Sequence, residues 1–587
     1  MIRLPSVQNL TGAIQRVIQR LPWVVLVAAA KATLLIILIE TPRAEEATHN
    51  LLVRLAFLLF LALPLLLTIR LLGERRHWSN TIQLGAVAGL VVLLIGYFFT
   101  INETPIQRDY YRFGLFMVAA HLLVSFAPFI GYREQQGFWE FNKTLFLQIL
   151  SATLYAGTLY IGLIIAIETV HFLFDVDYPF RIEADLFVLI FSFVHTILFL
   201  SGLPERLDTL EENLEYSRGL KLFTQYVLLP LEVVYLIILY VYSAKILVQW
   251  QLPEGGVAYL VVAFSVAGIL ALLLLYPLRD SAEERWIQLF TRRFHLALLP
   301  LIVLLFIGIF RRIRDYGITE NRYLVGILAV WLLGITVYFL FSKRDDIRLI
   351  PLTHCIISLL IAVGPWSIFG VSRQSQANRF RELLTQYQLL NSQQQVEGKA
   401  AVTTSDYDHL LSIVRYFRDR GEIQTLQPFF VQLPTRNNQT AVANAIELKL
   451  RNSLTAKAIP GEGSKVLNFS TRSAPNEVYS LDIRGFDQLW MFQVYGEQRI
   501  EQDDWMIQPA QNGRTLNIYQ ESTRITSWDI ATRLAELEQE YGASSNEVDP
   551  ARLRFDFQNG THSLRLVLRS VSRNGNNYSY EGILLRK

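Results

Sequence analysis

Long apolar stretches alternate with short charged loops through the first two thirds of the chain. Each stretch holds about 17–25 mostly apolar residues, the length that an α-helix needs to cross roughly 30 Å of hydrocarbon. After Ser372 no stretch of this length occurs. The pattern predicts an α-helical polytopic membrane bundle over residues 22–371. About eleven transmembrane helices are expected, at 22–39, 54–72, 82–100, 111–130, 144–168, 186–203, 225–247, 257–278, 295–310, 323–341 and 349–369.

An amphipathic helix is predicted ahead of the first span, over residues 1–21. Its apolar face recurs at helical spacing and consists of Val7, Leu10, Ile14, Val17, Ile18 and Leu21. Arg16 and Arg20 lie beside this face, Ser6 is a suitable N-cap, and Pro22 marks the start of the first span. A helix with this pattern is expected to lie in the membrane interface.

The remainder of the chain is predicted to form a helix and linker, 372–404, and then a small soluble α+β domain, 405–587. Ser405 can cap a helix that Gly421 ends, and Thr526 can cap a second helix. Alternating apolar residues predict strands at 479–483, 553–557, 564–568 and 578–580. The turn sequences Asn559-Gly560 and Asn574-Gly575 join the last three strands, which predicts a C-terminal antiparallel β meander.

Composition supports a membrane protein, because 52% of the residues are hydrophobic and only 18% are charged. The formal net charge of +3 is too small to indicate a nucleic-acid partner. The single cysteine, Cys355, can form no intrachain disulfide. The lipid bilayer is therefore the first expected partner.

The distribution of Lys and Arg predicts the orientation of the bundle. The loops that share a side with the N-terminus carry more of these residues than the alternate loops, and basic loops stay in the cytoplasm. This places the N-terminus inside a bacterial cytoplasmic (inner) membrane and, with an odd number of spans, the C-terminal domain in the periplasm or outside the cell. Four arginines between the ninth and tenth spans oppose this assignment.

Several short motifs along the first 420 residues form a distinctive set. They are Arg3-Leu4-Pro5-Ser6, Phe138-Trp139-Glu140-Phe141-Asn142-Lys143, Phe223-Thr224-Gln225-Tyr226-Val227-Leu228-Leu229-Pro230, Leu239-Tyr240-Val241-Tyr242 with Lys245-Ile246-Leu247, Tyr276-Pro277-Leu278-Arg279, Tyr316-Gly317-Ile318-Thr319-Glu320-Asn321-Arg322-Tyr323, and Gly364-Pro365-Trp366 with Val371-Ser372 and Ser375-Gln376. Together they resemble the bacterial membrane family known as domain of unknown function (DUF) four-one-five-three, whereas residues 430–587 match it only loosely. The family has no assigned activity, so the resemblance implies a membrane architecture and no reaction.

Ionisable groups inside predicted spans are candidates for function, because they are costly to bury and usually face a partner or a water-filled cavity. They are Lys31, His121, His195, Glu232 and His354. Glu232 follows Pro230, which can kink the seventh span. Two interpretations remain open for Glu232: a proton or cation site at a helix break, or an internal ion pair, with Lys31 as the candidate base.

A second candidate is a charge cluster between the ninth and tenth predicted spans. It comprises Arg311, Arg312, Arg314, Asp315, Glu320 and Arg322. One interpretation is a structural ion-pair network at the membrane surface. The other is an anion-binding face for lipid headgroups or phosphate.

No catalytic or metal-binding motif is present in the sequence, so an enzyme, a cofactor and a metal are not expected. Two hypotheses for the function follow. The first is a non-enzymatic envelope component, a sensor or scaffold, whose extracytoplasmic domain binds a protein partner. The alternative is a secondary transporter or permease with its site near Glu232. The oligomeric state stays open.

Overall fold

The computed structural model describes most of the chain. The described residues are 7–42, 44–179, 181–212, 216–249, 256–279, 285–342, 345–431, 433, 439–457, 467–471, 483–495, 499–502, 504–521, 523–541, 546–560, 562–574 and 577–587. They form two compact units. The first comprises Met1–Arg379 with Asp419–Gly421, and the second comprises Phe380–Arg418 with Glu422–Lys587. Most of the predicted linker, 372–404, therefore belongs to the second unit.

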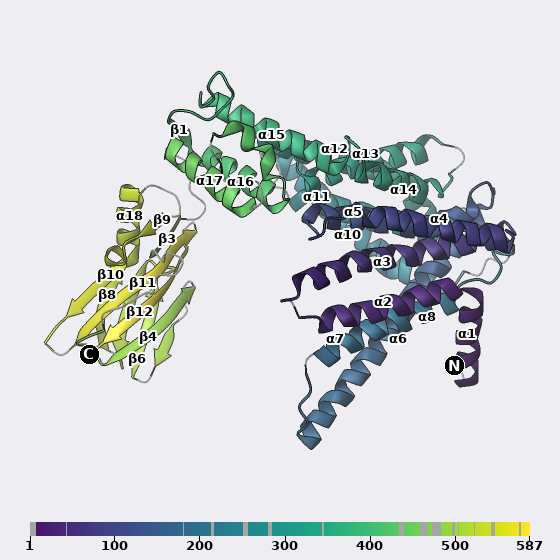
Figure 1. Ribbon diagram of the computed structural model, residues 1–587, viewed down its shortest axis with the longest axis horizontal. Helices are drawn as coiled ribbons and strands as arrows, with labels where there is room; N and C mark the ends of the chain where they lie inside the picture. The colour runs from purple at the N-terminus through teal and green to yellow at the C-terminus, as the bar shows by residue number, and fades with distance from the viewer. Residues whose placement is uncertain are drawn as a thin grey trace. The chain divides into compact units, whose positions relative to one another are not determined.

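The first unit is helical (Figure 1). Its helices are α1 (Val7–Arg20), α2 (Pro22–Glu40), α3 (Glu46–Arg75), α4 (Asn80–Phe98), α5 (Gln107–Phe126), α6 (Gln135–Phe174), α7 (Arg181–Val188), η2 (Leu189–Val194), α8 (His195–Ser201), α9 (Arg218–Phe223), η3 (Thr224–Leu228), α10 (Leu229–Gln249), α11 (Gly256–Leu275), η4 (Tyr276–Leu278), α12 (Arg285–Tyr316), α13 (Glu320–Phe341), α14 (Leu349–Ala362) and the start of α15 (Ile368–Gln386). The elements η2 and η3 are π-helical turns, and η4 is a 3-10 turn.

The predicted membrane bundle is confirmed. Within the described residues, ten helices are long and apolar enough to cross a membrane. The last predicted span, 349–369, corresponds to the shorter helix α14, which has 14 residues and a length of about 21 Å. It ends ahead of Gly364, whose φ of +83° interrupts the helix, and α15 then begins at Ile368. The predicted helix ahead of the first span is present as α1, while Ser6 lies outside the described residues.

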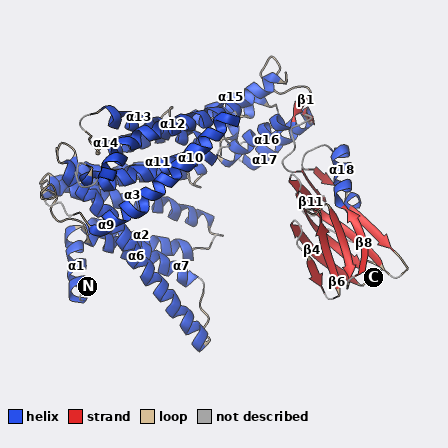
Figure 2. Ribbon diagram, turned by 180° about the vertical axis from the view of Figure 1, so that it is seen from behind, coloured by secondary structure: helices blue, strands red, loops and turns tan. Residues whose placement is uncertain are grey.

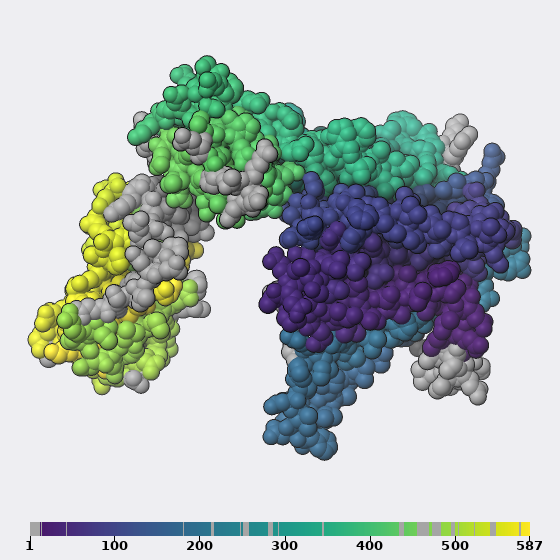
Figure 3. All heavy atoms as spheres, viewed as in Figure 1, coloured from purple at the N-terminus to yellow at the C-terminus, as the bar shows by residue number. Residues whose placement is uncertain are grey.

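The helices of the first unit bury several apolar clusters. Helix α3 packs against α2, α4 and α5, and α5 packs against α14. In the space-filling view, the N-terminal segments of this unit, coloured purple and dark blue, lie against one another (Figure 3). Phe129 and Phe141 are among the largest side chains that are fully buried. Helix α6 is longer than a bilayer requires, since its 40 residues span about 60 Å, and its outer end extends past the neighbouring helices (Figures 1 and 2).

The second unit is α+β, with its strands drawn in red in Figure 2. Its elements are the end of α15, β1 (Ala400–Thr403), α16 (Thr404–Asp419), α17 (Gln439–Ser453), β2 (Leu454–Lys457), β3 (Leu467–Thr471), β4 (Gln488–Tyr495), β5 (Ile500–Gln502), β6 (Trp505–Ala510), β7 (Thr515–Gln520), β8 (Thr523–Asp529), α18 (Ile530–Tyr541), β9 (Asn546–Val548), β10 (Arg554–Gln558), β11 (Ser563–Asn574) and β12 (Asn577–Arg586).

The strands of the second unit form three sheets within the described residues. The strand orders are β1-β2, β4-β12-β11-β3-β9 with β10 beside β11, and β5-β6-β7-β8. The predicted C-terminal meander is confirmed, because β11 pairs antiparallel with both β10 and β12. Asn559 closes the first turn by accepting the N–H of His562 on its side chain at 2.8 Å. The second turn, at Gly575, lies outside the described residues.

Some predicted boundaries in the second unit are wrong. Helix α16 begins at Thr404, two residues earlier than a cap at Ser405 predicts, and the hydroxyl of Thr403 accepts the N–H of Asp406 at 3.0 Å. Thr526 lies inside strand β8. Asp529 caps α18 instead of Thr526, because its carboxylate accepts the N–H of Thr532 at 3.0 Å.

The predicted strand at 479–483 is also wrong at the one residue of it that the structure describes. Ile483, the last residue of the predicted strand 479–483, lies in a loop before β4. The rest of that prediction lies outside the described residues. The predicted stop of α16 at Gly421 is confirmed, because Gly421 has φ +67° and the next N–H, of Glu422, bonds back to the carbonyl of Phe417 at 2.9 Å.

Candidate functional site

Glu232 is buried at the start of α10. Pro230 has no N–H to donate to the preceding turn, and that turn, η3, is π-helical. The Glu232 side chain is 4% exposed, and its Oε2 atom has no hydrogen-bond partner among the described residues. A Cβ atom at Gly268 of α11 would lie 3.2 Å from Oε2 and 2.2 Å from the ring of Phe294. The absence of a side chain at Gly268 therefore makes room for both the carboxylate and the aromatic ring.

The structure does not bring Lys31 to Glu232, so the predicted ion pair between them is wrong. Lys31 lies in α2, where its ammonium is 4.8 Å from the centroid of the Phe60 ring on α3. In the described part of the chain, neither Lys31 nor Glu232 forms a salt bridge. Lys31 lies on α2 and Glu232 lies on α10, and these two helices pack against different neighbours.

The predicted histidines are also separate from Glu232 in their contacts. His121 lies 2.8 Å from the carbonyl oxygen of Met117 in its own helix. His195 is 3.1 Å from the hydroxyl of Thr153 on α6. His354 packs against Trp331 with ring centroids 4.8 Å apart. Among the described residues, these contacts link His195 and His354 to neighbouring helices and His121 to its own helix, and none of them reaches the carboxylate.

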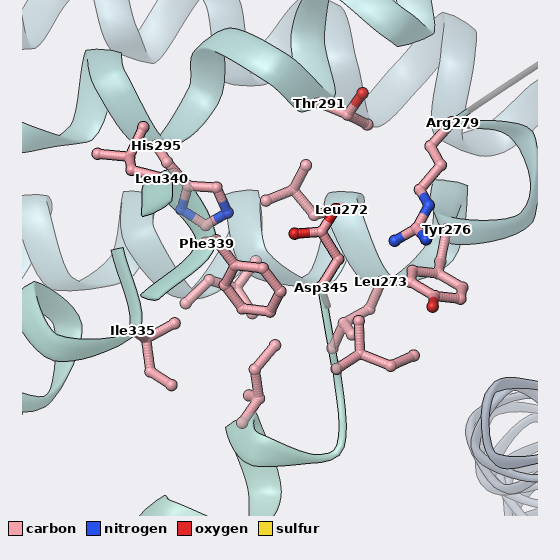
Figure 4. Close-up of a pocket in the computed structure, with 13 residues that line it drawn as sticks. Leu272, Leu273, Tyr276, Arg279, Thr291, His295, Ile335, Phe339, Leu340 and Asp345 are labelled. Carbon is pink, nitrogen blue, oxygen red and sulfur yellow. The ribbon is translucent and has the colours of Figure 1, made fainter. Parts of the chain in front are cut away.

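A pocket with a volume of about 300 Å³ lies between α11, α12, α13 and the loop before α14 (Figure 4). Apolar side chains of α11 and α13 form much of its wall, whereas α12 contributes Thr291 and His295. The polar groups that face it are Tyr276, Arg279, Thr291, His295 and Asp345. Its size falls at the lower end of the roughly 300–1,000 Å³ that is typical of small-molecule sites.

His295 is the most constrained polar group of this pocket. It is 7% exposed, and its ring lies parallel to that of Phe339 with centroids 5.1 Å apart. Its Nδ1 atom is buried without a hydrogen-bond partner among the described residues. Sequence reasoning missed this residue because it lies at the first position of a predicted span. Thr291, one helical turn before His295, could have indicated this residue, because residues four apart share a helix face and these two place polar groups on the same face.

A fixed ion pair holds the loop at the edge of the pocket. Arg348 donates from Nε and Nη2 to the Asp346 carboxylate, at 2.8 and 2.6 Å, and from Nη1 to the carbonyl of Tyr132. Burial alone would raise the pKa of Asp346, but the hydrogen bonds from Arg348 outweigh it and hold that pKa below the usual value. The neighbouring Asp345 is thereby positioned at the pocket wall.

The pocket offers a cation, a carboxylate, an imidazole and a hydroxyl above an apolar floor. Such a set can bind a small molecule that has a polar end and an apolar body. Among the described residues, no group of three or more His, Cys, Asp or Glu side chains is placed to hold a metal ion. Glu232 does not line this pocket.

Most of the predicted charge cluster, Arg311 to Arg322, is engaged in contacts within the first unit. Asp315 pairs with Arg311 at 3.7 Å and with Arg314 at 3.3 Å. Glu320 is 3% exposed and accepts two hydrogen bonds from Arg420, at 2.7 and 2.8 Å. Both carboxylates of the cluster are therefore in ion pairs with arginines.

The sequence motifs that carry the family resemblance also meet in space. Near the end of α11, Trp139 of α6 donates its indole N–H to the carbonyl of Leu273 at 2.6 Å, and the Tyr276 hydroxyl donates to Gln135. In α13, the Tyr323 hydroxyl donates to the carbonyl of Trp366 at 2.8 Å. These hydrogen bonds join segments more than forty residues apart, which gives the motifs a structural role.

Comparison with known proteins agrees with this architecture. A family model described as Domain of unknown function (DUF4153) matches residues 25–398. The Uncharacterized protein PM1469 of Pasteurella multocida (strain Pm70) is 28% identical over 345 residues, which are 58% of this chain and 56% of that protein. The chain thus spans about half the length of this curated relative. No solved structure matches the chain.

Proposed function

Because the chain belongs to the family described as Domain of unknown function (DUF4153), whose description gives no activity, we propose a function from the geometry of the molecule itself. The protein is a multi-pass membrane protein that acts as a non-enzymatic envelope component, a sensor or scaffold. Its helical unit anchors it in the bacterial inner membrane. With the short helix α14 as an eleventh crossing, its C-terminal unit lies outside the cytoplasm and binds a protein partner.

The observation that carries this proposal is the separate core of the C-terminal unit. Side chains from β7, β11 and α18 meet in one cluster, in which Leu516, Leu534 and Leu566 are fully buried. A unit with its own core folds as a domain and presents loops and strand edges from a rigid scaffold. A separate domain of this size supports a binding role in addition to membrane anchoring.

Ion pairs within the helical unit support the same interpretation. Its buried carboxylate Glu320 is held by Arg420, and Arg20 holds Glu74 through hydrogen bonds of 3.0 and 2.8 Å. Pairs of this kind tie helices to one another and favour one arrangement of the bundle. An anchor needs one arrangement, whereas alternating access needs two.

Complementation in cells tests the proposal. A chain that ends at Gly421 keeps the helical spans and Arg420 but lacks strands β2 to β12 of the second unit, and a full-length Glu232→Gln chain keeps both units. We expect the full-length variant to restore the envelope-stress resistance of a strain that lacks the protein, and the truncated chain to fail although it reaches the membrane at the wild-type level. Restoration by the truncated chain would contradict the proposal.

A secondary transporter remains the second candidate, because the buried Glu232 has a carboxylate oxygen without a partner next to a π-helical turn. Such turns are frequent at functional sites. Purified protein in liposomes that enclose a pH-sensitive dye tests it. Proton flux in the wild type that Glu232→Gln abolishes would favour transport over the anchor.

A further inference from the structure

The pocket at His295 contains a buried polar group that the protein leaves without a partner. The His295 side chain is 7% exposed, and it lines the pocket together with Thr291 of the same helix. Among the described residues, no hydrogen bond reaches the imidazole ring of His295. An unpaired polar atom in the interior is costly, and a bound molecule that hydrogen-bonds to this ring would remove part of that cost.

Asp345 brings a carboxylate without a counter-ion to the same pocket. It lines the wall, and within the described part of the chain it takes part in no salt bridge, whereas the adjacent Asp346 pairs with Arg348 at 2.6 Å. The backbone of Asp345 has φ +43°, a left-handed conformation that Asp and Asn adopt more readily than most residues. The loop is therefore fixed by Asp346, and the carboxylate of Asp345 is left for a cation in the pocket.

A cation and a hydroxyl group face the same space. Arg279 lines the pocket, and its guanidinium lies 4.1 Å from the centroid of the Tyr276 ring. The five N–H donors of a guanidinium allow contacts with more than one neighbour. The Thr291 hydroxyl donates to the carbonyl of Ile287 at 3.0 Å, so its oxygen can still accept a hydrogen bond. The pocket thus offers a partner for an anion and a partner for a cation.

The rest of the wall is apolar, and the space is small. Leu272, Ile335 and Leu340 are among the apolar side chains that line it. The volume of about 300 Å³ equals that of about ten water molecules at roughly 30 Å³ each, which admits a molecule of the size of an amino acid but not a whole phospholipid. Among the described helices, eight membrane spans precede Arg279 and ten precede Asp345, so both charges lie on the side of the membrane that holds the N-terminus.

We propose that this pocket binds an apolar α-amino acid of about the size of leucine. Its ammonium group lies at Asp345, its carboxylate lies at Arg279, and its side chain packs against the apolar wall, while His295 supplies a further hydrogen bond. In the view of Figure 4, Asp345 lies between Arg279 and His295. Two opposite charges on one small molecule match the two charges of the wall, whereas a fatty acid or a simple amine matches only one of them. The site lies in the helical unit, so the proposal is independent of the partner-binding role of the C-terminal unit.

Ligand analogues test the need for both charges on the unaltered protein. The measurement is equilibrium binding of radiolabelled L-leucine to the purified full-length protein in phosphatidylglycerol nanodiscs, where we expect saturable binding. The analogue 4-methylpentanoic acid lacks the amine of leucine, and 3-methylbutylamine lacks its carboxylate. Each should compete about tenfold or more weakly than unlabelled L-leucine, because each loses one charge-assisted contact. Replacing part of the phosphatidylglycerol with phosphatidylethanolamine should leave the binding of L-leucine unchanged.

Two variants locate the binding in the pocket. Asp345→Asn removes the charge and keeps a residue that tolerates positive φ, so we expect about tenfold weaker binding of L-leucine. His295→Phe keeps an aromatic ring against Phe339 and removes both ring nitrogens, so binding should weaken about fivefold. Its melting temperature should stay the same or rise, because an unpaired buried polar atom is removed, whereas a histidine with only a structural role would lower it when replaced.

Glu205→Gln is the matched control for the removal of a carboxylate. Glu205 is exposed and does not line the pocket. Six of the described membrane spans precede it, so it lies on the same side of the membrane as Asp345. We expect this variant to bind L-leucine as the wild type does.

Four results would overturn the proposal. The first is the absence of saturable L-leucine binding up to about 10 mM. The second is an analogue that competes as strongly as L-leucine, since the pocket would then not recognise both charges. The third is unchanged binding in both Asp345→Asn and His295→Phe, or an equal loss in Glu205→Gln, which would place the ligand outside the pocket. The fourth is loss of binding in phosphatidylethanolamine, whose headgroup is also a zwitterion, which would assign the pocket to a lipid headgroup. The analogue series needs no variant, so it decides the question even where a variant does not fold.

Discussion

Replacing Glu232 with Gln should change the stability of the protein very little. Removing one partner of a buried ion pair typically costs about 3–5 kcal/mol, because the other charge is left unpaired. That cost is absent here, since Glu232 has no ion-pair partner among the described residues. The amide keeps the shape of the carboxyl group and removes an ionisable group that is 4% exposed. We therefore expect a change of less than about 1 kcal/mol in the free energy of unfolding.

A double-mutant cycle with Lys31 makes this expectation sharper. Lys31→Met removes the ammonium group beside Phe60 and keeps most of the side-chain volume. Because the structure does not pair Lys31 with Glu232, the effects of Lys31→Met and Glu232→Gln should add within about 0.5 kcal/mol. Thermal unfolding of the purified variants, followed by tryptophan fluorescence in one detergent, supplies the four values of the cycle.

Gly268→Ala is the control that shows whether thermal unfolding detects a destabilising change next to Glu232. The added Cβ atom would lie 2.2 Å from the Phe294 ring, so the ring or the helix must move. Overpacking of this kind typically costs about 1–3 kcal/mol. A coupling energy above about 1 kcal/mol between Lys31 and Glu232, or a loss of 3 kcal/mol or more in Glu232→Gln alone, would refute the placement of the two residues.

Three further predictions concern topology and the C-terminal unit. A reporter fused after Lys587 should be active only outside the cytoplasm, and cytoplasmic activity of an intact fusion would reverse the orientation. A fragment of residues 380–587 should unfold cooperatively when it is followed by circular dichroism. It should be more stable than the fragment 400–587, because the shorter fragment lacks the buried end of α15. Equal stabilities of the two fragments would show that this end of α15 does not stabilise the domain. Asp529→Ala should lower the free energy of unfolding of 380–587 by about 1 kcal/mol at neutral pH, because Asp529 caps α18, and denaturant titration would measure it. Burial raises the pKa of Asp529, but hydrogen bonds from Thr532 and Ala531 bring it below the ordinary 3.8, so the difference should shrink as the pH falls below that value; a constant difference would exclude the carboxylate as its source.

The sequence by itself determined the membrane bundle and the C-terminal meander. Hydrocarbon about 30 Å thick admits only helices with roughly 20 apolar residues, so hydropathy along the chain is sufficient to place the spans. The meander was predictable for a similar local reason, because apolar residues that alternate on either side of Asn559-Gly560 specify two strands and the turn between them. The charged loop between α12 and α13 was also recognisable, since Arg311 to Arg322 concentrate charge between two apolar stretches.

Only the tertiary structure decided which of these charged and polar groups meet. The periodicity of a helix shows which residues share a face, but it does not show which neighbour that face contacts. Lys31 and Glu232 were plausible partners on charge alone, yet their helices pack against different neighbours. The partner of Glu320 is Arg420, one hundred residues away, which no local pattern indicates. The pocket at His295 likewise exists only because separate helices lie side by side.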